Sequence, residues 1–188
     1  MLRLFVSTLI VACWLVADVR ADVATTFNYS QWQAMVGEYS TIDFTGFSDG
    51  TPINTQYAPV GVTFTGASFI FASSGFVNDS WGLHGPSGLH LYFDEPQSWI
   101  AVHHAGNAYF KLYSGGELVG TGAYNPVGGI GSFVGAVSDI AFDEVVITKP
   151  SFDGFNIGID DLHWGGVPAP GALGLLGIAG LFSRRRRT

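Results

Sequence analysis

Short runs in which apolar and polar residues alternate dominate the middle of the chain. Residues 42–47 read Ile-Asp-Phe-Thr-Gly-Phe, and residues 61–65 read Gly-Val-Thr-Phe-Thr after a turn-forming Asp-Gly-Thr-Pro segment. Because successive side chains of a strand point to opposite faces of a sheet, this alternation predicts half-buried β-strands. Other runs rich in aromatic and β-branched residues predict strands at 68–72, 89–93, 99–103, 108–113, 117–121, 140–148 and 155–164.

A helical pattern occurs at one place, residues 30–38, where Ser30 is a candidate N-cap. Parallel strands need crossover connections of about a dozen residues, and the segments between the predicted strands are too short to hold them. Roughly ten short strands joined by turns therefore predict an all-β fold, an antiparallel β-sandwich or jelly roll. We expect one such domain over residues 22–166.

The N-terminal segment, residues 1–21, has the pattern of a secretory signal peptide. Arg3 supplies a positive charge, residues 4–17 form the apolar part, and small residues lead to a cleavage site after Ala21. The apolar part is shorter than a membrane-spanning helix, which needs about 20 residues. An N-terminal anchor that is never cleaved is the alternative interpretation. A lipoprotein-like motif ends at Cys13, but the apolar run continues beyond it, so we favour cleavage after Ala21.

The C-terminal segment, residues 167–188, combines a Pro-Ala-Pro motif, a short apolar stretch and a basic cluster. From Gly171 to Phe182 the apolar stretch would span about 18 Å as a helix at 1.5 Å per residue. Counted from Pro168, it would span about 23 Å. A bilayer core is about 30 Å thick, so temporary retention is favoured over permanent anchoring, with the basic cluster on the cytoplasmic side. A buried C-terminal helix is the alternative. The motif residues are Pro168, Pro170, Arg184, Arg185, Arg186 and Arg187.

This tail resembles a PEP-CTERM sorting signal. Proteins of that family are exported by Gram-negative bacteria that make extracellular polysaccharide, and a membrane protease-transpeptidase, exosortase, is thought to process them near the Pro-x-Pro motif. The family pattern has Glu between the prolines, where this chain has Ala169. The body is also similar to the carbohydrate-binding-module or lectin-like jelly rolls of such proteins, most of which have no assigned activity. The fragments that carry this second likeness are 42–44, 61–64, 133–135 and 158–162.

The charge of the expected mature domain differs from that of the whole chain. Its only basic residues are Lys111 and Lys149, against 14 acidic residues, which gives a net charge of about −12. Such a domain repels nucleic acid and anionic membranes, and its charged partners would be cations. The single cysteine, Cys13, lies in the leader, which excludes disulfides, thiolate catalysis and cysteine-bound zinc from the domain.

The candidate metal ligands are carboxylates. Asp160 and Asp161 are neighbours on a predicted strand and would face opposite sides. Asp160 could bind one structural calcium at the edge of the sandwich, with Asp43 as a second ligand if the first and last strands pair. Alternatively, Asp160 accepts backbone hydrogen bonds from a neighbouring loop. The five histidines lack a metal-binding spacing such as His-Glu-x-x-His, and we interpret them as hydrogen-bonded structural residues.

A candidate glycan-binding loop contains Asn78, Asp79 and Trp81, because an aromatic ring next to polar side chains can stack on a sugar and bind its hydroxyls. Packing of Trp81 in the core is the alternative. Catalysis has little support, since the Gly-x-Ser-x-Gly motif is absent. Asp139 and Asp143 share a strand face but do not match the Glu-x-Asp-x-Glu run of lectin-fold glucanases.

Together these patterns predict a non-enzymatic exported protein. We expect it to be anchored transiently in the inner membrane, sorted by an exosortase-type protease, and held at the cell surface or in the extracellular polysaccharide, where it binds glycan weakly. A purely structural or adhesive matrix component without a small ligand is the alternative. A glycan-active hydrolase is the least favoured interpretation.

Overall fold

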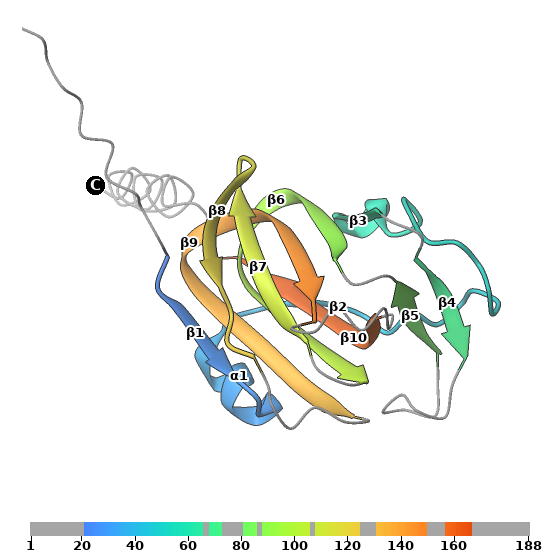
Figure 1. The fold of residues 1–188 in the computed structure, drawn as a ribbon, viewed down its shortest axis with the longest axis horizontal. Coiled ribbons are helices and arrows are strands. Elements are labelled where there is room, and N and C mark those ends of the chain that lie inside the picture. Colours follow the sequence, from blue (N-terminus) through green and yellow to red (C-terminus); the bar gives the residue numbers. More distant parts are fainter. Residues whose placement is uncertain are drawn as a thin grey trace, which may run out of the picture.

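The computed structural model describes residues 21–65, 68–72, 81–85, 88–105, 108–124, 131–149 and 157–166. Within these ranges the chain forms a ten-stranded sheet in which neighbouring strands pair antiparallel (Figure 1). The predicted all-β, antiparallel class is therefore confirmed.

The helices and strands follow one another in a simple order along the chain. The helix α1 (Tyr29–Met35) follows the first strand, and a short 3-10 helix, η1 (Ala58–Val60), precedes the third. The strands are β1 (Val23–Thr26), β2 (Ser40–Ile42), β3 (Val62–Thr65), β4 (Phe69–Ala72), β5 (Trp81–Gly85), β6 (Leu89–Ala105), β7 (Tyr109–Ser114), β8 (Glu117–Thr121), β9 (Ser132–Thr148) and β10 (Ile157–Gly165).

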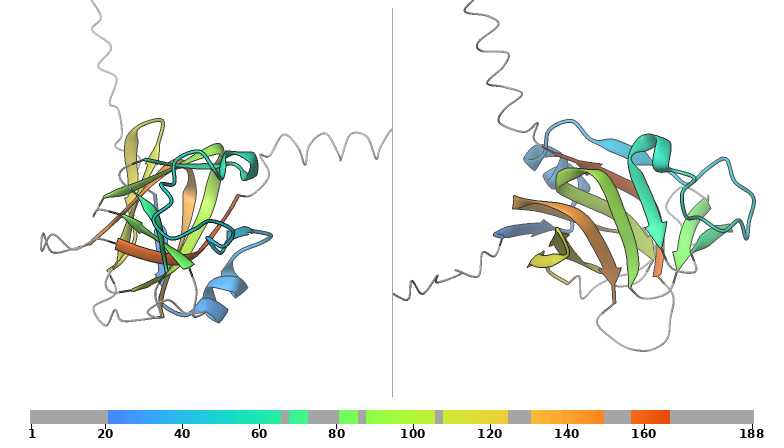
Figure 2. Two further views of the ribbon diagram at one scale, coloured as in Figure 1. Left: turned by 90° about the vertical axis from the view of Figure 1, so that its right-hand side faces the viewer. Right: turned by 90° about the horizontal axis from the view of Figure 1, so that it is seen from above.

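Two strands of 17 residues each, β6 and β9, organise the sheet. They pair with each other along most of their length, with register shifts between Tyr92 and Trp99. Before the shifts β6 pairs with β3, and after them it pairs with β10. The sheet thus has two halves, β3-β6-β9-β7-β8 and β4-β5-β10-β6-β9-β1, and β2 is attached to β10. Both long strands curve as they pass from one half to the other (Figure 2).

The main core lies between the two halves of the sheet. Phe110 and Val145 from the first half and Val102 and Ile159 from the second belong to one continuous cluster of buried residues. Strands carry side chains on alternate faces, so every second residue of β6 and β9 reaches this core. Burial of apolar side chains from both halves in one cluster stabilises the bend between them.

A smaller cluster covers the outer face of the second half, where α1 packs. Trp32 of α1 is fully buried there against Trp99, Ala101 and Phe133. The side chain of Asn28 accepts a hydrogen bond from the backbone N–H of Gln31 and so caps the helix N-terminus. This short helix encloses one face of β6 and β10 and brings the ring of its first residue against two histidines on that face.

The helix and the second strand begin and end at other residues than the sequence predicts. The N-cap is Asn28 and not Ser30, and the helix ends at Met35. The strand expected at 42–47 ends at Ile42, because the carboxylate of Asp43 binds the backbone N–H of Thr45 and the chain turns there. Local side-chain to backbone hydrogen bonds decided both boundaries.

Several strands differ from the prediction in number and length. The strands expected at 89–93 and 99–103 are one strand, because the Asp-Glu-Pro-Gln-Ser segment between them stays extended and bends. The strand expected at 140–148 begins at Ser132, β1 was not predicted, and β5 lies in a segment that the sequence indicates as a loop. The strands predicted near β3, β4, β7, β8 and β10 are confirmed.

The predicted signal peptide and sorting tail lie almost entirely outside the described residues. Ala21, the first described residue, donates its backbone N–H to the carbonyl oxygen of Val119 at 2.7 Å. Within the part of the chain that the structure describes, no helix has the length and apolar character needed to cross a membrane.

Candidate functional site

A polar cleft of about 460 Å³ lies where four separate segments of the chain meet. These segments are the connection from α1 to β2, the end of η1, the bend of β6 and the end of β10. The lining residues are Glu38, Tyr39, Ser40, Val60, Gly61, Asp94, Glu95, Gln97, Trp164, Gly165 and Gly166.

The lining of the cleft is acidic and rich in hydrogen-bond acceptors. Glu38, Asp94 and Glu95 are exposed, and none of the described residues that line the cleft is basic. The side-chain amide of Gln97 is mostly buried and donates to the backbone carbonyl of Glu95, which holds the bend of β6. Such a surface favours ligands that donate hydrogen bonds, such as sugar hydroxyls, and disfavours anions.

The floor of the cleft depends on Gly165. A Cβ atom at this position would lie 2.6 Å from the backbone oxygen of Glu38 and 2.3 Å from the indole nitrogen of Trp99. Only glycine therefore allows the segment after α1 to lie this close to the end of β10.

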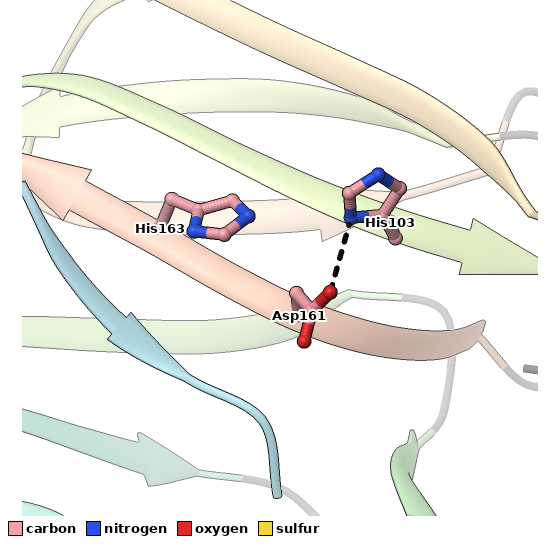
Figure 3. A group of neighbouring side chains, drawn as sticks. All are labelled: His103, Asp161 and His163. Atoms are coloured by element: carbon pink, nitrogen blue, oxygen red, sulfur yellow. Dashed lines mark ion pairs between the residues drawn. The ribbon is translucent and has the colours of Figure 1, made fainter. Parts of the chain in front are cut away.

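A second candidate site lies on the outer face of the sheet, beside a β-bulge in β10. Ile159 pairs with His104 and Leu162 with Val102, so three steps along β10 match two steps along β6. Asp161 lies two residues before His163, and His163 pairs with Ala101, so strand alternation places Asp161 on the face that carries His103 and His163 (Figure 3). One ligand atom from each of these three side chains lies within 4.8 Å of the others. We call them the His–Asp–His cluster.

Aromatic rings enclose the His–Asp–His cluster under α1. The ring centroid of Tyr29 lies 5.4 Å from that of His103 and 5.3 Å from that of His163, and Phe133 lies 5.2 Å from His103. His163 is only 4% exposed, whereas the side chains of His103 and Asp161 are 14% and 16% exposed. Solvent therefore reaches the cluster from the side of His103 and Asp161.

Hydrogen bonding orients the ring of His163. Its Nδ1 atom lies 2.9 Å from the hydroxyl oxygen of Thr41, while its Nε2 atom is buried without a hydrogen-bond partner among the described residues. Burial lowers the pKa of His163 to about 4; Asp161 acts in the opposite direction, and His103 lowers the pKa further. The imidazole is therefore neutral at pH 7.

Two further polar side chains at the cluster, those of Tyr29 and His103, are neutral or paired. Burial and the hydrogen bond with Tyr39 raise the pKa of Tyr29 to about 12, so its phenol keeps its proton. The Nδ1 atom of His103 lies 3.4 Å from a carboxylate oxygen of Asp161.

The predicted glycan loop is described only in part. Asn78 and Asp79 lie outside the described residues. Trp81 is the first residue of β5 and is partly buried against the main core, which leaves only part of its ring accessible.

The residues predicted to bind calcium, Asp160 and Asp43, differ in their surroundings. Asp160 is 1% exposed and lies in the bulge of β10. The first and last predicted strands do pair, since Ile42 lies opposite Leu162. Asp43 is nevertheless exposed, and one of its carboxylate oxygens accepts from the backbone N–H and the hydroxyl of Thr45. Among the described residues, the one group of three or more His, Cys, Asp or Glu side chains close enough to share an ion is the His–Asp–His cluster, which includes neither residue.

The other acidic and histidine candidates make structural contacts. Asp139 accepts from the backbone N–H of Asp22 at 2.8 Å, and both carboxylate oxygens of Asp143 accept from the backbone N–H of Gly115. The Nδ1 atom of His90 lies 2.6 Å from a carboxylate oxygen of Glu144 on the neighbouring strand. Burial lowers the pKa of His84. These contacts agree with the interpretation of these residues as structural.

Compared with known protein families, with curated proteins and with solved structures, the chain shows no significant match. Its function has to be inferred from the geometry of the cleft and of the His–Asp–His cluster.

Proposed function

We propose that this chain is an exported, non-catalytic protein of the cell surface or extracellular matrix whose β-sheet domain binds polysaccharide in the polar cleft. The acidic cleft, which has exposed carboxylates and no basic side chain among its described lining residues, is the observation that carries the proposal. Export and sorting rest on the N-terminal and C-terminal sequence patterns, with an exosortase-type protease and the inner membrane as transient partners.

The chemistry of the cleft suits neutral glycans. Carboxylates accept hydrogen bonds from sugar hydroxyls more strongly than uncharged groups do, and the cleft presents Glu38 from the segment after α1 and Asp94 and Glu95 from the bend of β6. A cleft with so few apolar contacts would bind weakly, which suits a protein held in a matrix by many copies of its ligand.

The proposal can be tested by removing charge from the cleft without changing its shape. The full chain, an Asp94→Asn/Glu95→Gln double variant and a Glu117→Gln control are applied to a glycan array and to gels containing neutral or acidic polysaccharides. We expect the wild type to bind neutral glycans and the double variant to lose about ten-fold or more in affinity, because each hydrogen bond to a charged group contributes about 1.5–3 kcal/mol. Glu117 is exposed on β8 outside the cleft, so its variant should bind as the wild type does.

Other outcomes would point to other functions. If the double variant binds glycan as the wild type does and Trp81→Ala loses glycan binding, the binding site is the loop that contains Trp81. Absence of binding to every glycan would contradict the proposal and favour a structural or adhesive matrix component.

Sorting is tested separately by mass spectrometry of the mature protein from exosortase-producing cells. We expect a C-terminus near Pro168 and Pro170 and a protein that leaves the inner membrane. A Pro168→Ala/Pro170→Ala variant should keep its C-terminal arginines and remain in the membrane fraction. Recovery of the intact tail from the wild type would contradict processing by such a protease.

A further inference from the structure

We infer that the His–Asp–His cluster binds a divalent transition-metal ion, such as zinc, through His103, Asp161 and His163, with a remaining coordination position open to solvent. This inference goes beyond the polysaccharide cleft and rests on a different set of side chains. His103 comes from β6, and Asp161 and His163 come from the bulge in β10 and the segment directly after it (Figure 3).

The donor atoms of the cluster suit a transition metal and not calcium. Two imidazole nitrogens and one carboxylate oxygen are ligands of borderline softness, and zinc sites commonly use three such ligands with water in the fourth position. Calcium takes six to eight oxygen ligands, which this cluster does not offer. The side chains of His103 and Asp161, 14% and 16% exposed, are the parts of the cluster nearest to solvent, which would supply the water ligand.

The contact between Nδ1 of His163 and the hydroxyl of Thr41 suits His163 as a ligand. Metal-binding histidines usually donate the N–H of the second ring nitrogen to a nearby oxygen, which fixes the tautomer. Here Nδ1 lies 2.9 Å from the Thr41 hydroxyl, and in the tautomer in which Nδ1 donates to that oxygen, Nε2 presents its lone pair to a metal. Figure 3 shows one ring nitrogen of His163 on the side of His103 and Asp161.

A bound metal would account for a polar atom that the protein otherwise leaves without a partner. The contact between His103 and Asp161 explains those two side chains without an ion. It does not explain Nε2 of His163, which is buried and has no hydrogen-bond partner in the described part of the chain. Buried polar atoms left unpaired are rare and costly in native proteins, and coordination would satisfy this one.

The present spacing is close to that of a metal site. Zinc bonds of about 2.0–2.2 Å require ligand atoms roughly 3.3 Å apart in tetrahedral geometry. The contact between His103 and Asp161 already measures 3.4 Å, and the largest separation in the cluster is within 4.8 Å. Small side-chain rotations would bring the three ligand atoms to bonding distance.

The test uses the untagged full chain, freed of metal with a chelator that is then removed. Zinc chloride is titrated by calorimetry and cobalt(II) chloride by visible absorption. We expect one ion per chain, a rise in melting temperature with zinc, and the visible bands of low-symmetry, nitrogen- and oxygen-bound cobalt. Calcium chloride should produce no heat at this site.

Variants distinguish the cluster from other histidines of the chain. His103→Gln, Asp161→Asn and His163→Gln should each lower affinity for cobalt at least ten-fold, while His84→Gln and His90→Gln should bind as the wild type does. Thr41→Val should weaken binding about ten-fold or more by freeing the His163 ring, and Thr41→Ser should restore it. Circular dichroism without metal shows whether each variant is folded, and the partly exposed His103 makes His103→Gln the safest of the ligand variants.

The proposal fails if the wild type binds neither zinc nor cobalt at one ion per chain. It also fails if folded His103→Gln binds as tightly as the wild type, or if His84→Gln or His90→Gln removes binding instead. Loss of glycan binding in the cleft variants would leave these results unchanged, because the Asp94 and Glu95 side chains are not part of the cluster.

Discussion

Individual buried polar atoms differ in whether the fold gives them a partner. Tyr57 packs its ring against Phe44, Phe47 and Phe64, with centroids 5.7–6.1 Å apart, and its hydroxyl is buried without a hydrogen-bond partner among the described residues. Burial, with a smaller contribution from Asp43, raises the pKa of Tyr57 to about 12. Tyr29 is the contrasting case, since its hydroxyl lies 3.0 Å from that of Tyr39.

The Tyr57→Phe substitution should therefore leave the free energy of unfolding unchanged or raise it by up to about 1 kcal/mol, because no hydrogen bond is lost. The Tyr29→Phe control, which removes a paired hydroxyl, should lower it by about 1 kcal/mol. Urea unfolding at pH 7 measures both values. A loss in Tyr57→Phe as large as that in Tyr29→Phe would show that the Tyr57 hydroxyl has a stabilising partner.

Alkaline pH gives a second check on Tyr57. A tyrosine whose pKa is raised in the folded state stabilises the protein fully below the ordinary value of 10.0, and that stability is lost as the pH rises toward 12. We expect the wild type to lose more stability than Tyr57→Phe between pH 10 and pH 12. Parallel pH curves for the two proteins would contradict the raised pKa.

At the scale of single elements, helix α1 depends on tertiary contacts. A helix of seven residues is too short to be stable by itself, so its position is set by the Asn28 cap and by the burial of Trp32. Trp32 lies directly over Gly135 of β9, where an added Cβ would be 2.3 Å from a ring carbon. The helix in turn covers the His–Asp–His cluster through Tyr29.

Gly135→Ala should displace Trp32 and lower the free energy of unfolding by about 1–3 kcal/mol, as overpacked cores do. Its tryptophan fluorescence should shift to the red as Trp32 becomes exposed. Gly37→Ala is the matched control, because a Cβ there would make ordinary contacts of 3.5 Å with Trp99. Equal stability of the two variants would contradict the close packing of Trp32 on Gly135.

At the scale of the whole molecule, β6 and β9 join the two halves of the sheet into one unit. Both strands contribute side chains to the same core before and after the bend. Phe142 lies in the bend of β9, where it is fully buried, and its ring centroid is 6.2 Å from that of Phe93. Phe93 in turn lies 6.1 Å from Trp164, so the contacts continue from β9 through β6 to β10.

Phe142→Ala should lower the free energy of unfolding by about 3–5 kcal/mol, because it leaves a cavity between the two halves. Far-ultraviolet circular dichroism and tryptophan fluorescence should still report one transition at the same denaturant concentration. Phe71→Ala, on the strand β4 where the side chain is 39% exposed, should cost less than about 1 kcal/mol. Two separate transitions would show that the halves unfold independently.

The sequence by itself determined the fold class and the chemistry available to the domain. Alternation of apolar and polar residues is a local property of a strand, so strands such as 62–65 and 117–121 could be predicted without knowing their partners. The lack of cysteine and the excess of acid in the domain were likewise readable from composition.

Only the tertiary structure decided which side chains meet. The register between β6 and β10 places Asp161 beside His103, which is 58 positions earlier in the chain. The cleft likewise combines residues from four distant segments. Register, bulges and bends depend on pairing between strands, and no local pattern in one strand encodes the residue that its partner places opposite.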